Sequence, residues 1–133
     1  FPYEMRYKEI HRALNKVILL GLTPVVAHVE RYNDVDEKGV QELINMGAYI
    51  QVNAASVLKP KLIGDKHKHY KKRAKKYLDA ELVHFIASDM HNIDSRRTYM
   101  REAYNIIEEK YGPTIAYELF EKNQEKLLMN KII

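Results

Sequence analysis

Three short apolar segments, separated by helix-like segments, constrain the fold of this 133-residue chain more than any other feature. The segments are Pro24–His28, Ala48–Val52 and Leu82–Ala87. Each is almost continuously apolar, as strands are when both of their faces are covered. Between and after them, apolar residues recur at helical spacing. This alternation predicts an α/β protein with a parallel sheet and helical crossovers.

The expected helices have recognisable start and stop signals. Asp34 or Asp36 is suited to cap the second helix, Pro113 begins the fifth, and Gly21, Gly47 and Gly112 end three of them. Residues 58–65 form a loop. The length of the chain predicts a single domain, 1–133. The expected helices cover residues 3–20, 34 or 36 to 46, 66–80, 95–111, 113–121 and 123–130.

Composition excludes several classes of protein. The chain has no cysteine, which rules out disulfides and thiolate metal sites and agrees with a cytoplasmic location. No apolar run approaches the roughly 20 residues of a membrane span. The net charge of +4 comes from one segment, because the remaining residues are net acidic once the seven cations of residues 66–76 are set aside.

This basic segment has three interpretations. Its lysines form a solvated helix face, or they dock an acidic peptide or protein, or they attract nucleic acid without sequence preference. Tyr70 and Tyr77 lie on the expected packing stripe with Ala74 and Leu78, so we interpret both tyrosines as core contacts.

Polar residues follow each of the three predicted strands. Parallel α/β proteins place their sites at the carboxyl ends of strands, so these residues are expected to meet there. Asp89 and His91 are two positions apart and point to the same side of an extended chain. An oxygen and a nitrogen ligand suit manganese, zinc or iron. The polar ends are His28/Glu30/Arg31, Gln51/Asn53 and Asp89/His91/Asn92.

Three of these segments, taken together, resemble a known family. Residues 27–32 (AHVERY), 51–54 (QVNA) and 84–92 (HFIASDMHN), followed by Arg96, are similar to the manganese-dependent protein-tyrosine phosphatases of the polymerase-and-histidinol-phosphatase (PHP) superfamily. Those enzymes belong to Gram-positive capsule and exopolysaccharide systems. The resemblance covers nearly the whole chain.

The resemblance implies a fold and a metal centre. The fold is a distorted PHP-type (β/α) barrel, of which this chain would be the C-terminal portion without the N-terminal strands. The implied metal ligands are His28, Asp89 and His91. The cofactor is manganese, as two or three divalent ions, with iron, zinc or magnesium as alternatives.

The resemblance also implies a reaction, the hydrolysis of phosphotyrosine in a protein by metal-bound hydroxide. Arg31 and Arg96 would be catalytic and hold the substrate phosphate, since a guanidinium fork fits phosphate oxygens. Asn53 is also predicted to bind substrate. Asn53 and Gln51 both suit hydrogen bonds that organise a loop as well. The implied partner is a bacterial tyrosine autokinase of polysaccharide synthesis.

The chain departs from the family pattern in two places. Val29 stands where the family usually has proline. The His-x-His strand and a glutamate that precede this region in the family are not in the chain, so we expect the fragment alone to be inactive. Two open sheet edges favour a homo-oligomer. Two alternative functions remain open, a non-catalytic scaffold and a basic nucleic-acid-binding domain.

The other polar residues have plainer interpretations. Glu30 is expected to pair with a nearby cation, and His84 to pack within its strand. His11, His67 and His69 are expected on solvated helix surfaces.

Overall fold

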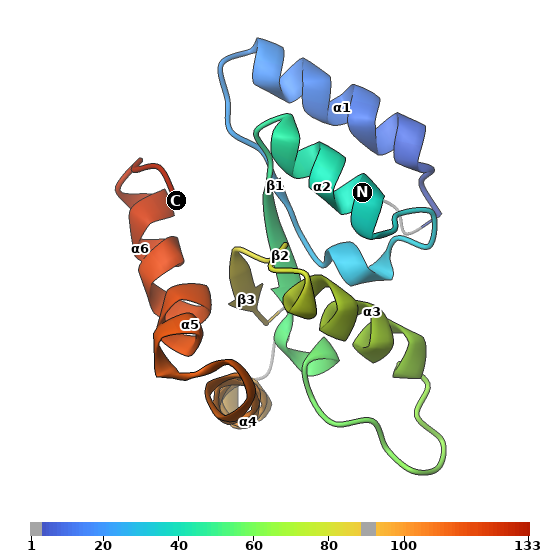
Figure 1. Cartoon of the computed structure of the whole chain (residues 1–133), viewed down its shortest axis with the longest axis vertical. Helices are drawn as coiled ribbons and strands as arrows, with labels where there is room; N and C mark the ends of the chain where they lie inside the picture. Colours follow the sequence, from blue (N-terminus) through green and yellow to red (C-terminus); the bar gives the residue numbers. More distant parts are fainter. Residues whose placement is uncertain (1–3, 89–92) are drawn as a thin grey trace.

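A parallel sheet lies at the centre of the molecule (Figure 1). The computed structural model describes residues 4–88 and 93–133, with their side chains except those of residues 93–98. Within this part of the chain the strands follow the order β1–β2–β3 and both pairings are parallel. The predicted α/β class is therefore confirmed. The strands are β1 Val25–Val26, β2 Tyr49–Asn53 and β3 Phe85–Ala87.

Helices cover the sheet from two sides. Figure 1 shows α1 and α2 on one side of the strands and α4, α5 and α6 on the other. Short helical turns follow β1 and β2, and a π-helical turn joins α5 to α6. The helices are α1 Tyr7–Leu19, α2 Glu37–Asn45, α3 Lys68–Asp79, α4 Ile93–Tyr111, α5 Pro113–Tyr117 and α6 Asn123–Leu128; the turns are η1 Val29–Arg31, η2 Ala54–Ser56 and η3 Glu118–Lys122.

The start of α1 is fixed by hydrogen bonds to α2 and the residues before it. The Tyr7 N–H donates to Asp34 (2.8 Å) and the Tyr7 hydroxyl donates to Glu42 (2.6 Å). Burial and the Glu42 carboxylate raise the pKa of Tyr7 to about 12. Asp36 caps α2 by accepting the Gly39 N–H at 2.8 Å. Of the two caps predicted for α2, Asp36 is therefore the correct one, and α1 begins later than predicted.

The buried apolar side chains form two clusters. One lies between the sheet and α1, α2 and α3, and the other lies between β3, the end of α3, and α4, α5 and η3. Both sides of the sheet are thus covered, which explains why the strands are apolar throughout. The first cluster includes Ile10, Leu14, Val40, Leu43, Ile50 and Val52; the second includes Ile86, Ala103, Ile107, Ala116 and Leu119.

Side chains at the start of α6 donate hydrogen bonds to a backbone carbonyl of β3 and to that of the residue before it. The Asn123 amide donates to the His84 carbonyl (2.8 Å), and the Gln124 amide donates to the Ile86 carbonyl (3.3 Å). These two backbone acceptors are therefore satisfied. Within the described residues the sheet order is β1–β2–β3, so the two outer strands have no further strand partner, as predicted.

Candidate functional site

The chain turns sharply at His28, directly after β1. His28 has φ 39° and ψ 52°, in the left-handed region that residues other than glycine rarely adopt. The Arg31 N–H then donates to the His28 carbonyl (3.0 Å) and closes η1. The strand predicted to run through His28 therefore ends at Val26. Left-handed residues persist where the surrounding structure holds them, often at functional sites.

Gln51 holds this turn to the rest of the sheet. Its side-chain oxygen accepts the His28 N–H, and its side-chain nitrogen donates to the Ala87 carbonyl at 3.4 Å. Gln51 lies on the central strand, so one amide connects the carboxyl ends of β1 and β3. In the sequence, Ala87 precedes Asp89 by two residues and His91 by four. The predicted role of Gln51 in organising the loops is confirmed.

Glu30 is the buried acid of the site. It is 0% exposed, and its Oε1 accepts the Asn53 N–H (3.1 Å) and the Ser56 hydroxyl (2.7 Å). Burial raises the pKa of the Glu30 carboxyl, and these hydrogen bonds and the Arg31 charge oppose that shift. Glu30 accepts hydrogen bonds from two neutral donors, which join η1 to the end of β2, and among the described residues it is in no ion pair of the expected kind.

Arg73 holds the same loop from α3. Its Nη1 donates to the Glu30 carbonyl and to the Asn33 side chain, both at 3.1 Å. Arg73 therefore makes structural hydrogen bonds, unlike a cation on a solvated helix face. The interpretation of α3 as a solvated helix is therefore wrong at this position.

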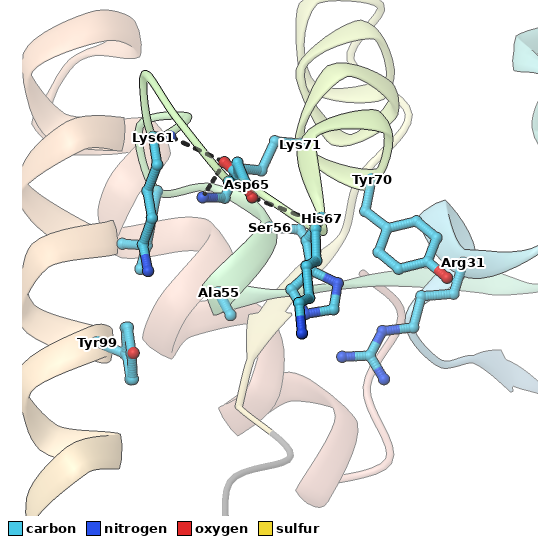
Figure 2. Close-up of a pocket in the computed structure, with 12 residues that line it drawn as sticks. Arg31, Ala55, Ser56, Lys61, Asp65, His67, Tyr70, Lys71 and Tyr99 are labelled. Atoms are coloured by element: carbon cyan, nitrogen blue, oxygen red, sulfur yellow. Dashed lines mark hydrogen bonds and ion pairs between the residues drawn. The ribbon is translucent and has the colours of Figure 1, made fainter.

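Beside η1 lies a pocket of about 470 Å³ (Figure 2). Figure 2 shows Arg31, His67 and Tyr70 on one side of it and Tyr99, from α4, on the opposite side. The Arg31 guanidinium carbon lies 6.0 Å from the centre of the Tyr70 ring, within reach of a cation–π interaction. His67 stacks on the same ring with an interplanar angle of 17°.

The position of Tyr70 corrects the sequence interpretation. Tyr70 is half-buried and lines the pocket, whereas Tyr77 is 1% exposed and bonds the Val35 carbonyl (2.7 Å). Burial raises the pKa of Tyr77 to about 12. Only Tyr77 is thus the core contact that was predicted. The first turn of α3 projects beyond the core, which places Tyr70 next to Arg31.

Asp65 closes the loop that forms the rim of the pocket. Its carboxylate accepts the Lys61 N–H (2.9 Å), the His67 N–H (3.0 Å) and the Lys71 ammonium (2.9 Å). The bond from Lys71 is the main reason why the pKa of Asp65 falls to about 2. Lys71 is therefore a structural cation, and the pocket receives its positive charge from Arg31, Lys61 and Lys66.

His84 is packed, as predicted. Its ring Nδ1 accepts the Ile50 N–H (3.0 Å), and its backbone N–H donates to the Ile50 carbonyl (2.9 Å). The ring also contacts Tyr49 edge-on, with centroids 5.1 Å apart. Burial lowers the pKa of His84. The imidazole therefore takes the place of a backbone carbonyl in extending the pairing of β2 with β3.

The structure places some of the predicted site residues and not others. His28 and Arg31 lie in one turn at the carboxyl end of β1, and Asn53 ends β2. The Asn53 side chain accepts the Ala55 N–H (3.0 Å), and Asn53 is 1% exposed. The predicted ligands Asp89 and His91 lie outside the described residues, and so does the side chain of Arg96, whose backbone belongs to α4.

A metal centre is compatible with this arrangement. Within residues 4–88 and 93–133, no three histidine, aspartate or glutamate side chains that the structure describes are grouped to hold an ion. His28 nevertheless lies at the same end of the sheet as Ala87, to which Gln51 joins it. A set of His28, Asp89 and His91 has the mixed nitrogen and oxygen donors that divalent transition metals accept.

No helix in the described part of the chain is long and apolar enough to cross a membrane. The fold and the candidate site together define a parallel α/β protein with polar residues at the carboxyl ends of β1 and β2 and a pocket lined by Arg31 beside them. This is the usual location of sites in such folds.

Comparison with known proteins identifies the family. Residues 1–129 match the family described as "Capsular polysaccharide synthesis, CpsB/CapC", and the chain belongs to this family. It is 50% identical over 135 residues to the tyrosine-protein phosphatase CpsB of Streptococcus pneumoniae, covering 100% of this chain and 56% of that protein. It is 32% identical to the tyrosine-protein phosphatase YwqE of Bacillus subtilis, of which it covers 51%.

The fold agrees with a solved structure of the same family. The match has a TM-score of 0.79 and 28% sequence identity, and it covers 100% of this chain and 52% of the other. That structure is described as "Crystal structures of YwqE from Bacillus subtilis and CpsB from Streptococcus pneumoniae, unique metal-dependent tyrosine phosphatases". The resemblance inferred from the sequence motifs is confirmed. The chain spans about half the length of the curated relatives it matches.

Proposed function

We propose that the full-length protein is a metal-dependent phosphatase that hydrolyses phosphotyrosine in proteins. The observation that carries this proposal is the pocket beside η1, in which Arg31 and Tyr70 lie together at the carboxyl end of a parallel sheet. The relatives are tyrosine-protein phosphatases, and the similar solved structure is described as metal-dependent. We further propose that residues 1–133 form one domain, the C-terminal part of a PHP-type barrel.

In this proposal His28, Asp89 and His91 hold part of a centre of two or three divalent ions, with manganese as the preferred metal. Such ions, when bound, lower the pKa of a coordinated water so that it can act as a nucleophile at neutral pH. The role of this chain is to fix the ligands. The left-handed turn at His28 and the Gln51 amide set the position of the first ligand.

The arginines bind the phosphate in this proposal. Arg31 presents planar donors to phosphate oxygens, and a guanidinium can bind two of them at once. Because the charge on these oxygens changes during the reaction, fixed donors stabilise the transition state. We assign Arg96 to the same task. Asn53 belongs to the end of β2, which supports these phosphate-binding residues. Tyr70 and His67 line the same pocket as Arg31 and form the wall beside which the aromatic ring of the substrate would lie.

We further infer that the physiological substrate is a bacterial tyrosine autokinase involved in polysaccharide synthesis. Membership of the capsular polysaccharide synthesis family supports this choice of partner. A homo-oligomer is also part of the proposal, since β1 is an outer strand of the described sheet.

The experiment is a metal-depletion assay on the full-length protein with a phosphotyrosine peptide. Hydrolysis should stop after treatment with a chelator and return when manganese is added. Asp89→Asn should prevent recovery and lower the metal content, because a neutral amide is a weaker ligand. Glu108→Gln, on an exposed part of α4, is the matched control and should recover fully. Full activity in the chelator would refute the proposal and leave the scaffold alternative to be tested.

A further inference from the structure

A second hollow, of about 530 Å³, lies between α3 and α4 and is lined with apolar side chains. Leu58 and Ile106 are half-buried on its walls, and Leu78 and Ile107 are buried beneath it. We call it the α3–α4 groove. Aliphatic side chains left open to solvent in a groove of this size favour binding of a large apolar side chain.

The rim of the α3–α4 groove is made of lysines. Six line it, and two of these form ion pairs: Lys71 with Asp65 at 2.9 Å and Lys110 with Asp79 at 3.3 Å. Among the described residues, the other four are in no ion pair; they are Lys59, Lys68, Lys72 and Lys75. An apolar floor with a cationic rim is complementary to a segment that carries acidic residues around an apolar one.

The groove adjoins the pocket lined by Arg31. Ser56, Leu58 and Lys71 line both hollows. Lys71 is fixed by Asp65, so the wall between them has a defined position. A peptide whose phosphotyrosine occupies the first pocket can therefore place neighbouring residues in the second.

We propose that the α3–α4 groove binds an acidic segment of the phosphoprotein substrate and takes one large apolar side chain of that segment on its floor. The proposal rests on the proposed phosphatase function and adds a determinant of substrate choice. A nucleic acid is a poorer fit, because its phosphates would engage the lysines and leave the aliphatic floor uncovered. Proteins that bind single strands use aromatic side chains for stacking.

The test compares two triple variants of the full-length protein that lose the same charge. K68Q/K72Q/K75Q removes three unpaired lysines of the rim. K16Q/K38Q/K76Q removes three exposed lysines that line neither hollow. Thermal melting by circular dichroism confirms that both variants fold. The substrates are p-nitrophenyl phosphate and a phosphotyrosine peptide with glutamates around one leucine.

The rim variant should raise KM for the acidic peptide roughly tenfold, since three partly exposed ion pairs together are worth about that factor in affinity. Its kcat for the peptide and its kinetics on p-nitrophenyl phosphate should match those of the wild type. The control variant should change KM for the peptide less than twofold. Replacing the leucine of the peptide by serine should raise KM several-fold in the wild type and have little effect in the rim variant.

Equal KM changes in the two variants would overturn the proposal, because they would show that net charge alone attracts the peptide. An unchanged KM for the serine peptide would overturn it as well, because the floor would then play no part. Binding of the unphosphorylated acidic peptide, measured by fluorescence anisotropy, separates this proposal from the phosphatase function. If neither phosphorylated substrate is hydrolysed but the peptide binds wild type and not the rim variant, only the proposed function fails. Duplex DNA that competes fully with the bound peptide would favour a nucleic-acid partner instead.

Discussion

Replacing Glu30 tests whether its buried carboxyl joins η1 to the end of β2. Glu30→Ala would leave the Asn53 N–H and the Ser56 hydroxyl without their acceptor in a fully buried place. Each buried unsatisfied donor costs about 1–3 kcal/mol, and the small cavity adds about 1 kcal/mol. We expect a loss of about 4 kcal/mol in the free energy of unfolding. That is a large fraction of the stability of a typical domain.

Glu30→Gln separates the hydrogen bonds from the charge. The amide oxygen can accept both donors, so this variant should keep most of the stability. Because the folded-state pKa of Glu30 is raised, the carboxyl stabilises the fold fully below its unfolded pKa of about 4.5 and progressively less at higher pH. Glutamine does not titrate. The stability of Glu30→Gln relative to the wild type should therefore increase between pH 5 and pH 8.

The assay is urea unfolding of the full-length protein, followed by circular dichroism at pH 5 and pH 8. A loss below about 1 kcal/mol in Glu30→Ala would show that the two donors find other partners, and the bridging role would be refuted. A stability difference between Glu30→Gln and wild type that does not rise with pH would refute the raised pKa.

Three further predictions concern the site and the sheet. Arg96→Lys should lower kcat/KM for a phosphotyrosine peptide roughly tenfold or more, because an ammonium cannot replace the guanidinium fork; the same loss in Arg97→Lys instead would move the assignment by one residue. Gln51→Leu should weaken metal binding to the full-length protein about tenfold, measured by titration, with little change in its circular dichroism spectrum, because the His28 turn loses its support; unchanged affinity would contradict this. Since burial lowers the folded-state pKa of His84, its contribution to stability is present above the unfolded value of 6.5 and is lost as the pH falls below it. His84→Asn can still accept the Ile50 N–H, so urea unfolding should show a smaller loss of stability from pH 7 to pH 5.5 than in the wild type.

Much of the fold could be predicted because the strands are buried on both faces. A continuous apolar run identifies such a strand without reference to its partners, as for residues 48–52 and 82–87. The first strand was predicted too long, because its end depends on a tertiary bond. The Gln51 side chain holds His28 in a left-handed turn from another strand, and the segment around His28 contains no signal of that bond.

The predictions for single polar residues were less successful for a similar reason. The sequence predicts that Glu30 pairs with a nearby cation, but its hydrogen-bond donors come from β2 and η2. Arg73 and Tyr70 belong to one basic helix, yet one holds a loop and the other lines a pocket. Helical periodicity shows which side of α3 is buried, whereas the partners of the opposite side depend on how η1 and the 58–65 loop pack against it. The ligand and substrate-binding roles came from the motifs and stay predictions for all six residues, His28, Arg31, Asn53, Asp89, His91 and Arg96.

The central claim is that this chain supplies only part of a phosphatase metal centre. The most direct measurement compares residues 1–133 with the full-length protein, each verified by mass, for bound manganese and for hydrolysis of a phosphotyrosine peptide. His28, Asp89 and His91 alone should hold single ions weakly, so residues 1–133 should show no more than trace activity in excess manganese. The full-length protein should bind two or three ions and hydrolyse the phosphotyrosine peptide. Comparable hydrolysis by the two would contradict the claim, and would place the ligands among the histidines that we interpret as structural or solvated, His11, His67, His69 and His84.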